Sequence, residues 1–339
     1  MRGTTEMLPI VVALLAAFAG VVLLGPVFIG LLQRLGFGKQ IRSDGPESHF
    51  GKAGTPTMGG MLLVVVVMFL AMAMRIEDAY TLTPMLALVG VAILGAIDDF
   101  VNIHTGMGVR GRFKLVWQTV VALLAAFYIE RHFAIPGVNI SFISVPIPFA
   151  GEVVIGGILF VLFVAFVIVG VSNAVNLTDG LDGLASGVLI FTFVAYLLIA
   201  LVAVPEGKPS QPNLAVFCAL IIGALMGFLW FNVHPAQLFL GDAGSLSLGA
   251  TLAVVATITA QLPLLAVIGA VFFAVIMSVV LQVISFRLRG RRIFRMTPLQ
   301  HHFELIGWAE EKITVRFWIV GALAGLLGFS LYLATVRGL

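Results

Sequence analysis

The most constraining feature of this chain is a series of long apolar runs, each long enough to cross a bilayer as a helix. A transmembrane helix needs about 18 or more mostly apolar residues, and ten runs meet this length. They cover residues 8–33, 56–74, 80–97, 113–131, 152–174, 183–204, 213–231, 243–260, 263–286 and 313–336. We therefore predict an all-α integral membrane protein with ten transmembrane helices, built as one polytopic membrane domain over residues 1–339.

The composition supports this class and excludes others. Apolar residues make up 60% of the chain and charged residues only 10%, whereas a soluble domain is about a quarter charged. Such a surface could not be wetted as a soluble globule, which excludes a soluble enzyme and a nucleic-acid-binding protein. Cys218 is the only cysteine, so a secreted disulfide scaffold is excluded as well.

The placement of the charges predicts the orientation in the membrane. Most of the 19 lysine and arginine residues lie in the loops after the odd-numbered spans, and positively charged loops stay in the cytoplasm. Ten spans put both termini on one side, so we expect both termini outside. One external segment, Val138 to Phe149, alternates loosely in polarity and predicts a small β-hairpin.

Most of the 16 acidic residues and most of the six histidines gather on the same predicted cytoplasmic face. The positive-inside rule concerns lysine and arginine and does not require this. Because these residues come from separate loops, we predict one composite polar site at the membrane surface. A secondary transporter, the alternative from another class, would place ionisable residues near the midplane, and their position at span ends disfavours it.

Two aspartate motifs lie at span ends. Asp98 and Asp99 finish the third span, and adjacent carboxylates repel each other unless they share a cation or a proton. This fits a metal-assisted phosphate site or a general base, but also a helix that simply ends at the aqueous boundary. Asp242 opens the eighth span, where a helix N-terminus suits phosphate and where aspartate is also a common N-cap.

The most polar motif is NAVNLTDGLDGLA, residues 173–185. Asn and Asp recur in it every three residues, so a helical end turns them to roughly one side. Glycines 180 and 183 allow the backbone to approach a ligand closely. A loop without a function would rarely be so polar and yet lack lysine and arginine, so a functional role is favoured.

Basic side chains accompany these acids. Lys52 lies beside a turn rich in Gly and Thr, and Lys114 opens the fourth span as either an anion contact or a snorkelling anchor. His301, His302 and Glu304 form a group in the last loop that suits a metal or an anionic substrate equally. No P-loop pattern occurs in the chain.

These groups together indicate phosphate chemistry. Several aspartates favour a hard cation, most simply Mg²⁺, which bridges carboxylates to phosphates. The nearby lysines, arginines and histidines suit a pyrophosphate, and a lipid phosphate and a soluble nucleotide can meet at the membrane surface. Phosphoryl transfer needs mainly positioning and charge neutralisation, which this residue set could supply.

The motifs are similar to those of the polyprenyl-phosphate N-acetylhexosamine-1-phosphate transferases over nearly the whole chain. The matching segments are the aspartates at 98–99, residues 173–185, FLGDAGSLSLG at 239–249 and PLQHHFELIGW at 298–308. GTPTMGG at 54–60 and the HHFE segment resemble members that use UDP-N-acetylmuramoyl-pentapeptide. The resemblance implies undecaprenyl phosphate as acceptor, lipid I and UMP as products and Mg²⁺ as cofactor. It also implies a multi-pass protein of the bacterial cytoplasmic membrane whose site faces the cytoplasm, and a homodimer is one assembly that it leaves open.

The resemblance also implies residue roles. Asp98 resembles the base that deprotonates the lipid phosphate, with Asp99 beside it, and Asp242 resembles a magnesium ligand, with Asp179 in the metal neighbourhood. An older two-step scheme would instead make an aspartate the nucleophile. Gly180, Leu181, Asp182 and Phe239 match the uridine pocket. The other positions that match substrate contacts are Lys52, Thr57, Lys114, Asn176, Asp179, Asn232, His301 and His302.

Two positions depart from the pattern of this family. Asn102 stands where the family often has the lysine of DDxxK, with Arg110 or Arg112 as substitutes, and Gln300 stands where it usually has the first of three histidines. A sister transferase that uses UDP-N-acetylglucosamine is the nearest alternative. The segments 298–308 and 54–60 argue against it.

Overall fold

The computed structural model describes residues 2–38, 52, 54–135, 138–139, 143–147, 151–202 and 210–337. The described part contains nine helices that are long and apolar enough to cross a membrane, which confirms the predicted all-α integral membrane class. The helices are α1 (Arg2–Arg34), α2 (Gly59–Ala73), α3 (Ala79–Thr105), α4 (Gly111–His132), α5 (Gly157–Thr178), α6 (Leu184–Leu201), α7 (Pro212–Asn232), α8 (Gly241–Ile258), α9 (Leu265–Ile268), α10 (Ala270–Arg289), α11 (Leu299–Leu305) and α12 (Glu310–Arg337).

The helix α2 explains why the described part has nine such helices rather than ten. It is apolar, but it has only 15 residues. At about 1.5 Å per residue it reaches about 22 Å, short of the hydrocarbon core of about 30 Å. A tenth span over residues 56–74 therefore stays a prediction.

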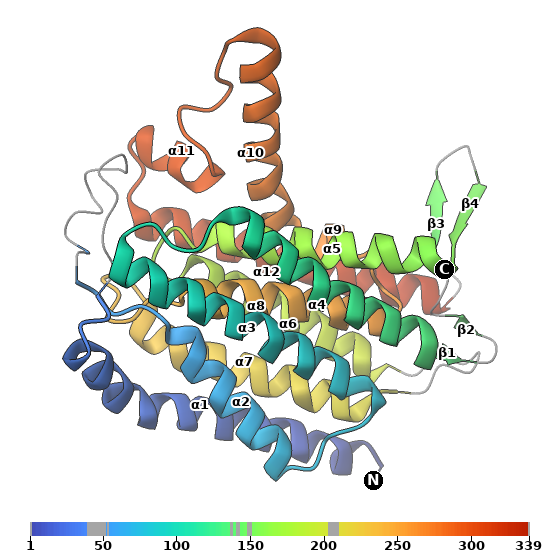
Figure 1. The fold of residues 1–339 in the computed structure, drawn as a ribbon. Helices are drawn as coiled ribbons and strands as arrows, with labels where there is room; N and C mark the ends of the chain where they lie inside the picture. Colours follow the sequence, from blue (N-terminus) through green and yellow to red (C-terminus); the bar gives the residue numbers. More distant parts are fainter. Residues whose placement is uncertain are drawn as a thin grey trace.

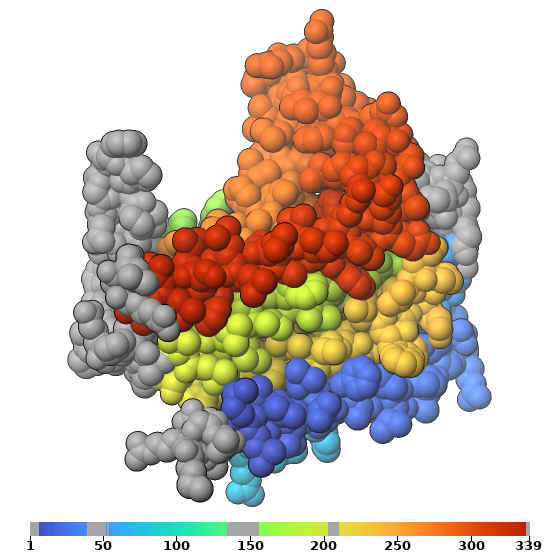
Figure 2. All heavy atoms as spheres, turned by 180° about the vertical axis from the view of Figure 1, so that it is seen from behind, coloured from blue at the N-terminus to red at the C-terminus, as the bar shows by residue number. Residues whose placement is uncertain are grey.

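The helices α7 and α8 form the centre of the bundle. α8 packs against α2, α3 and α5, while α7 packs against α1, α2 and α6. α12 crosses over α6, and Figure 2 shows it running between α6 and the part of the molecule that contains α10 and α11. α8 is buried along almost its whole length. Apolar side chains such as Leu23 and Val27 of α1 are exposed instead, as a lipid-facing surface requires.

Glycines bring α2 and α3 unusually close to the start of α8. A Cβ atom added at Gly95 of α3 would overlap the backbone of Asp242 and Ala243, and one added at Gly60 of α2 would overlap Gly244. Without a hydrophobic driving force between helices in lipid, small residues allow the close van der Waals packing that holds such a bundle together. These contacts fix the end of α8 that carries Asp242.

The predicted span 263–286 is interrupted in the structure. The chain forms the short helix α9, changes direction at Gly269 and continues as α10 to Arg289. In Figure 1, α10 stands across the common direction of the other long helices, with α11 beside it. The basic segment after this span therefore lies at the far end of α10, whose last turn carries Arg287 and Arg289.

Between α4 and α5, the described residues form four short strands. β1 (Ala134–Ile135) pairs with β2 (Val138–Asn139), and β3 (Ile143–Ile147) pairs with β4 (Gly151–Ile155), both antiparallel. A hairpin is thus present, but it extends beyond the predicted segment 138–149, part of which lies outside the described residues. The strands, the start of α1 and the end of α12 share one end of the bundle (Figure 1).

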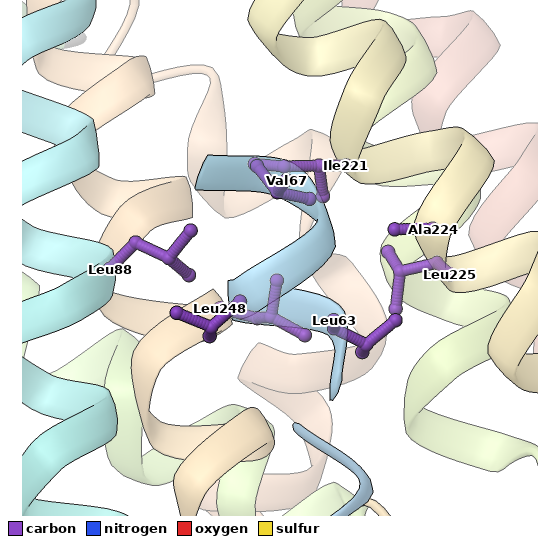
Figure 3. Close-up of a pocket in the computed structure, with 8 residues that line it drawn as sticks. Leu63, Val67, Leu88, Ile221, Ala224, Leu225 and Leu248 are labelled. Carbon is purple, nitrogen blue, oxygen red and sulfur yellow. The ribbon is translucent and has the colours of Figure 1, made fainter. Parts of the chain in front are cut away.

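A small apolar cavity of about 10 Å³ lies between α2, α3, α7 and α8. Figure 3 shows Leu63, Val67, Leu88, Ile221 and Leu248 around it. A cavity of this size is at the lower limit for a single water molecule, and its lining offers no polar partner. This cavity therefore offers no place for polar chemistry.

Candidate active site

One lysine bridges two aspartates where three helices end or begin. Lys114, in the first turn of α4, places its Nζ 2.6 Å from Asp98 Oδ2 and 2.7 Å from Asp242 Oδ2. Asp98 lies near the end of α3, is 3% exposed, and accepts a second hydrogen bond of 2.6 Å from the Val109 amide. The cation that two close carboxylates require is thus the Lys114 ammonium. We call Asp98, Lys114 and Asp242 the aspartate–lysine site.

Asn176 approaches this site from α5. Its Nδ2 donates to Asp242 Oδ1 and to Ser245 Oγ, both at 2.8 Å. The side chain of Asp242 is therefore held from α4 on one oxygen and from α5 on the other. Asp179 lies one turn after Asn176 and follows the last residue of α5. Of the residues with the three-residue spacing, Asn176 reaches the predicted aspartate, whereas Asn173 bonds to Gln118 and Asp182 to Lys52.

Asp99 faces the start of α8. Its Oδ1 accepts the Asp242 amide at 3.1 Å and its Oδ2 accepts the Ala243 amide at 3.2 Å. The first amides of a helix have no partner within the helix, and a negative charge is favoured there. Gly241 has φ +73°, and a Cβ there would collide with Asp99 and with Thr57. Asp99 thus anchors the turn that presents Asp242, and Thr57 lies beside it.

A second lysine bridges a second pair of carboxylates. Lys52 Nζ lies 2.8 Å from Asp182 Oδ1 and 2.6 Å from Glu310 Oε1, and His234 Nδ1 lies 2.9 Å from Asp182 Oδ2. We call these four residues the Lys52 cluster. The ligand atoms of Asp182, His234 and Glu310 lie close enough together to hold a metal. The Lys52 ammonium bonds to two of these residues, Asp182 and Glu310.

Residues predicted to line a nucleotide pocket surround the turn before α6. Asn232 Oδ1 accepts the Gly183 amide and the Ser186 hydroxyl, both at 3.1 Å, and Asn232 Nδ2 donates to the Leu238 carbonyl. Asn232 and Leu181 are buried, at 2% and 4% exposure, so they shape the turn from inside. Phe239 is half-buried and its backbone pairs with Pro56 and Gly59.

The glutamine and the two histidines of α11 point to different neighbours. Buried Gln300 donates from Nε2 to the Leu177 carbonyl at 2.7 Å. His301 and Gln300 both lie against Gly180, where an added Cβ would be 3.0 Å from His301 Nε2. His302 Nδ1 instead accepts the Arg295 amide at 3.2 Å. The structure therefore brings His301 to the predicted pocket, whereas His302 faces the segment before α11.

Some of these features could not be read from the sequence. The cation beside Asp98 is Lys114, whereas Arg110 and Arg112, the expected substitutes, are exposed. The sequence motifs also assign no role to His234 or Glu310. In the sequence they are noticeable only because they belong to the predicted face that is rich in acids and histidines. No spacing pattern separates Glu310 from its exposed neighbour Glu311.

Comparison with known proteins identifies the family. The glycosyl transferase family 4 profile matches residues 81–260, a range that includes the aspartate–lysine site. A "Phospho-N-acetylmuramoyl-pentapeptide-transferase" of Geobacillus sp. (strain WCH70) is 43% identical over 329 residues, which cover 94% of this chain and 96% of that relative. The chain belongs to this transferase family. A relative of the same name from Anoxybacillus flavithermus (strain DSM 21510 / WK1) is 42% identical over 323 residues, 92% of this chain and 94% of its own.

Proposed function

We propose that this protein transfers phospho-N-acetylmuramoyl-pentapeptide from its UDP-linked precursor to undecaprenyl phosphate, which yields lipid I and UMP. The observation that carries the proposal is the convergence of Asp98, Lys114, Asn176 and Asp242 at one end of a membrane bundle. The chain is similar along nearly its whole length to proteins named phospho-N-acetylmuramoyl-pentapeptide-transferase, and this similarity supports the proposed choice of substrate. In this proposal the site faces the cytoplasm of a bacterial membrane and the reaction is the first membrane step of peptidoglycan synthesis.

The donor atoms of the site suit magnesium. Asp98 Oδ2 and Asp242 Oδ2 both contact the Lys114 ammonium, so these carboxylates already bind one cation. Carboxylate oxygens are also the ligands that Mg²⁺ prefers. We propose that Asp242, together with Asp179, holds Mg²⁺ when substrate is bound. The ion would neutralise charge on the pyrophosphate during transfer.

The residues of the chain suggest how the transfer proceeds. In this scheme Asp98 takes the proton from the lipid phosphate, and the freed oxygen attacks the β-phosphorus of the UDP group. A new oxygen–phosphorus bond forms, the bridge between the α- and β-phosphates breaks, and UMP leaves with the bonding electrons. Lys114 has three N–H donors, of which two go to Asp98 and Asp242. The third can donate to a phosphate oxygen.

The proposed function has a direct test, which is also a metal-removal prediction. We expect the purified protein to release UMP only with both undecaprenyl phosphate and UDP-N-acetylmuramoyl-pentapeptide. We expect EDTA to stop the release and Mg²⁺ to restore it, because the substrate phosphates need a counter-charge. UDP-N-acetylglucosamine serves as the control donor. Reaction with that donor alone would replace our proposal by the sister activity, and full turnover in EDTA would contradict the proposed metal.

Gln300 leads to a second prediction. Its amide satisfies the Leu177 carbonyl, an acceptor in the last turn of α5 that has no partner within the helix. A histidine ring can donate the same hydrogen bond, so Gln300→His should keep the rate of UMP release within about twofold of wild type. Gln300→Leu leaves the half-buried Leu177 carbonyl without this donor and should lower the rate about tenfold. Equal rates for the two variants would show that this hydrogen bond does not matter.

A further inference from the structure

Glu310 is the acidic residue that opens α12, and it is held inside the molecule. Its side chain is 9% exposed, whereas that of the next residue, Glu311, is 59% exposed. Glu310 Oε1 accepts the Asp182 amide at 2.7 Å and also contacts Lys52 Nζ at 2.6 Å. One carboxylate oxygen of α12 therefore joins two segments that are distant in the sequence.

The direction of the Lys52 side chain depends on this contact. A lysine ammonium has three N–H donors on a flexible stem. Among the described residues, two of these donors go to Asp182 Oδ1 and Glu310 Oε1. Two fixed carboxylates from different segments hold the ammonium in one direction, and the third N–H remains for an acceptor atom of a ligand.

The turn that carries Asp182 is docked on α12 in the same way. Glu310 accepts the Asp182 amide, and the Asp182 carbonyl accepts the Thr314 hydroxyl at 3.3 Å. Asp182 Oδ2 also accepts the Ala236 amide at 3.1 Å. The start of α12 therefore sets the backbone position of Asp182 in this turn. Among the described residues, the hydrogen bonds and ion pairs of Glu310 go to Lys52, Asp182 and His234 and not to the aspartate–lysine site.

We propose that Glu310 is a positioning residue for nucleotide binding: it aims Lys52 and fixes the turn 180–182 that receives the uridine end of the substrate. The inference rests on the proposed function, because that function supplies the nucleotide. Glu310 acts through Lys52 and the turn rather than on the reacting phosphates. Its loss should therefore weaken the binding of substrate and transition state equally, which raises KM and leaves kcat unchanged.

Steady-state kinetics of Glu310→Gln test this role. The glutamine keeps the shape of the side chain but loses the charge that orients Lys52. We expect KM for the UDP-linked substrate to rise about tenfold, with kcat and the KM for undecaprenyl phosphate within about twofold of wild type. Glu311→Gln removes the same charge at the next position, which is exposed, and should leave all three constants within about twofold.

Two further variants keep the test decisive. Lys52→Met should show the same rise in KM alone. The double variant with Glu310→Gln should be little worse than either single variant, because each substitution breaks the same Lys52–Glu310 ion pair. If Glu310→Gln fails to fold in a thermal unfolding assay, Lys52→Met carries the test by itself.

The outcomes that would overturn the inference are distinct from failure of the proposed function. An unchanged KM in a folded Glu310→Gln protein, a fall in kcat alone, or an equal defect in Glu311→Gln would each overturn it. A kcat defect in Lys52→Met would do the same. If wild-type protein releases no UMP at all, the proposed function fails instead.

Discussion

Replacement of Asp98 by asparagine is expected to lower the rate of UMP release by roughly 10²- to 10⁴-fold, the usual contribution of a general base. Asparagine keeps the shape of the side chain and an oxygen that can accept the Val109 amide. It cannot take a proton from the lipid phosphate, and it loses the ion pair with Lys114. The measurement is UMP release by the purified variant with saturating substrates and Mg²⁺, together with its thermal unfolding temperature.

A matched control for this variant lies at the other end of the same helix. Asp78 is the N-cap of α3, and its side chain accepts the Thr81 amide. Asparagine is as good an N-cap as aspartate, and the Asn213 amide that donates to Asp78 Oδ2 can turn over to accept from the new side chain, so Asp78→Asn should fold and react like wild type. Asp98→Asn protein that is folded and keeps more than about a tenth of the wild-type rate would contradict the role of general base.

Two lysine-bridged pairs of carboxylates form the polar end of the bundle. A charge that leaves water is costly unless it is paired and hydrogen-bonded, and Lys114 and Lys52 each supply a partner for two acids. The end of α5 and the turn after it connect the pairs, because Asn176 bonds to Asp242 and the chain then leads to Asp182. In the proposed function, this one segment would align the nucleotide with the reacting phosphates.

The transmembrane helices were largely predictable because lipid imposes a simple rule on composition. A long apolar run in lipid must satisfy its backbone hydrogen bonds within the protein, and a helix does so within the run itself, so most of the apolar runs appear as helices. The break at Gly269 and the direction of α10 were not predictable. Gly269 is one of 37 glycines, and nothing in its local sequence distinguishes a helix break from a packing contact.

The polar residues at the helix ends stand out in the sequence, but the partner of each one does not. The acids at 98, 99 and 242 and the polar motif at 173–185 stand out in an apolar chain. Which cation neutralises Asp98 depends on how α3 and α4 pack. Glu310 and Glu311 are the same residue at neighbouring positions, and only the orientation of α12 buries the first and exposes the second.

The close packing of α3 on α8 gives the second prediction with a large effect. In Gly95→Ala, the new Cβ would overlap the Asp242 carbonyl and the Ala243 amide, and backbone atoms cannot move aside as a flexible side chain can. We expect overpacking to cost about 1–3 kcal/mol of stability. We also expect α8 to shift, which would draw Asp242 away from Lys114 and its amide away from Asp99. A displacement of about 1 Å in a catalytic group lowers a rate about 100-fold, so UMP release should fall by about that factor.

Gly90 provides the control on the same helix. A Cβ there would lie 3.4 Å from Val121 Cγ1, which is ordinary contact with a movable side chain. The gain in helix propensity from glycine to alanine is about 1 kcal/mol at either position, so the difference between the two variants isolates the contact with α8. Gly90→Ala should match or exceed wild type in thermal stability and keep its rate. If Gly95→Ala behaves in the same way, the approach of α3 to α8 does not hold Asp242 in place, and the bonds from Lys114 and Asn176 must suffice to do so.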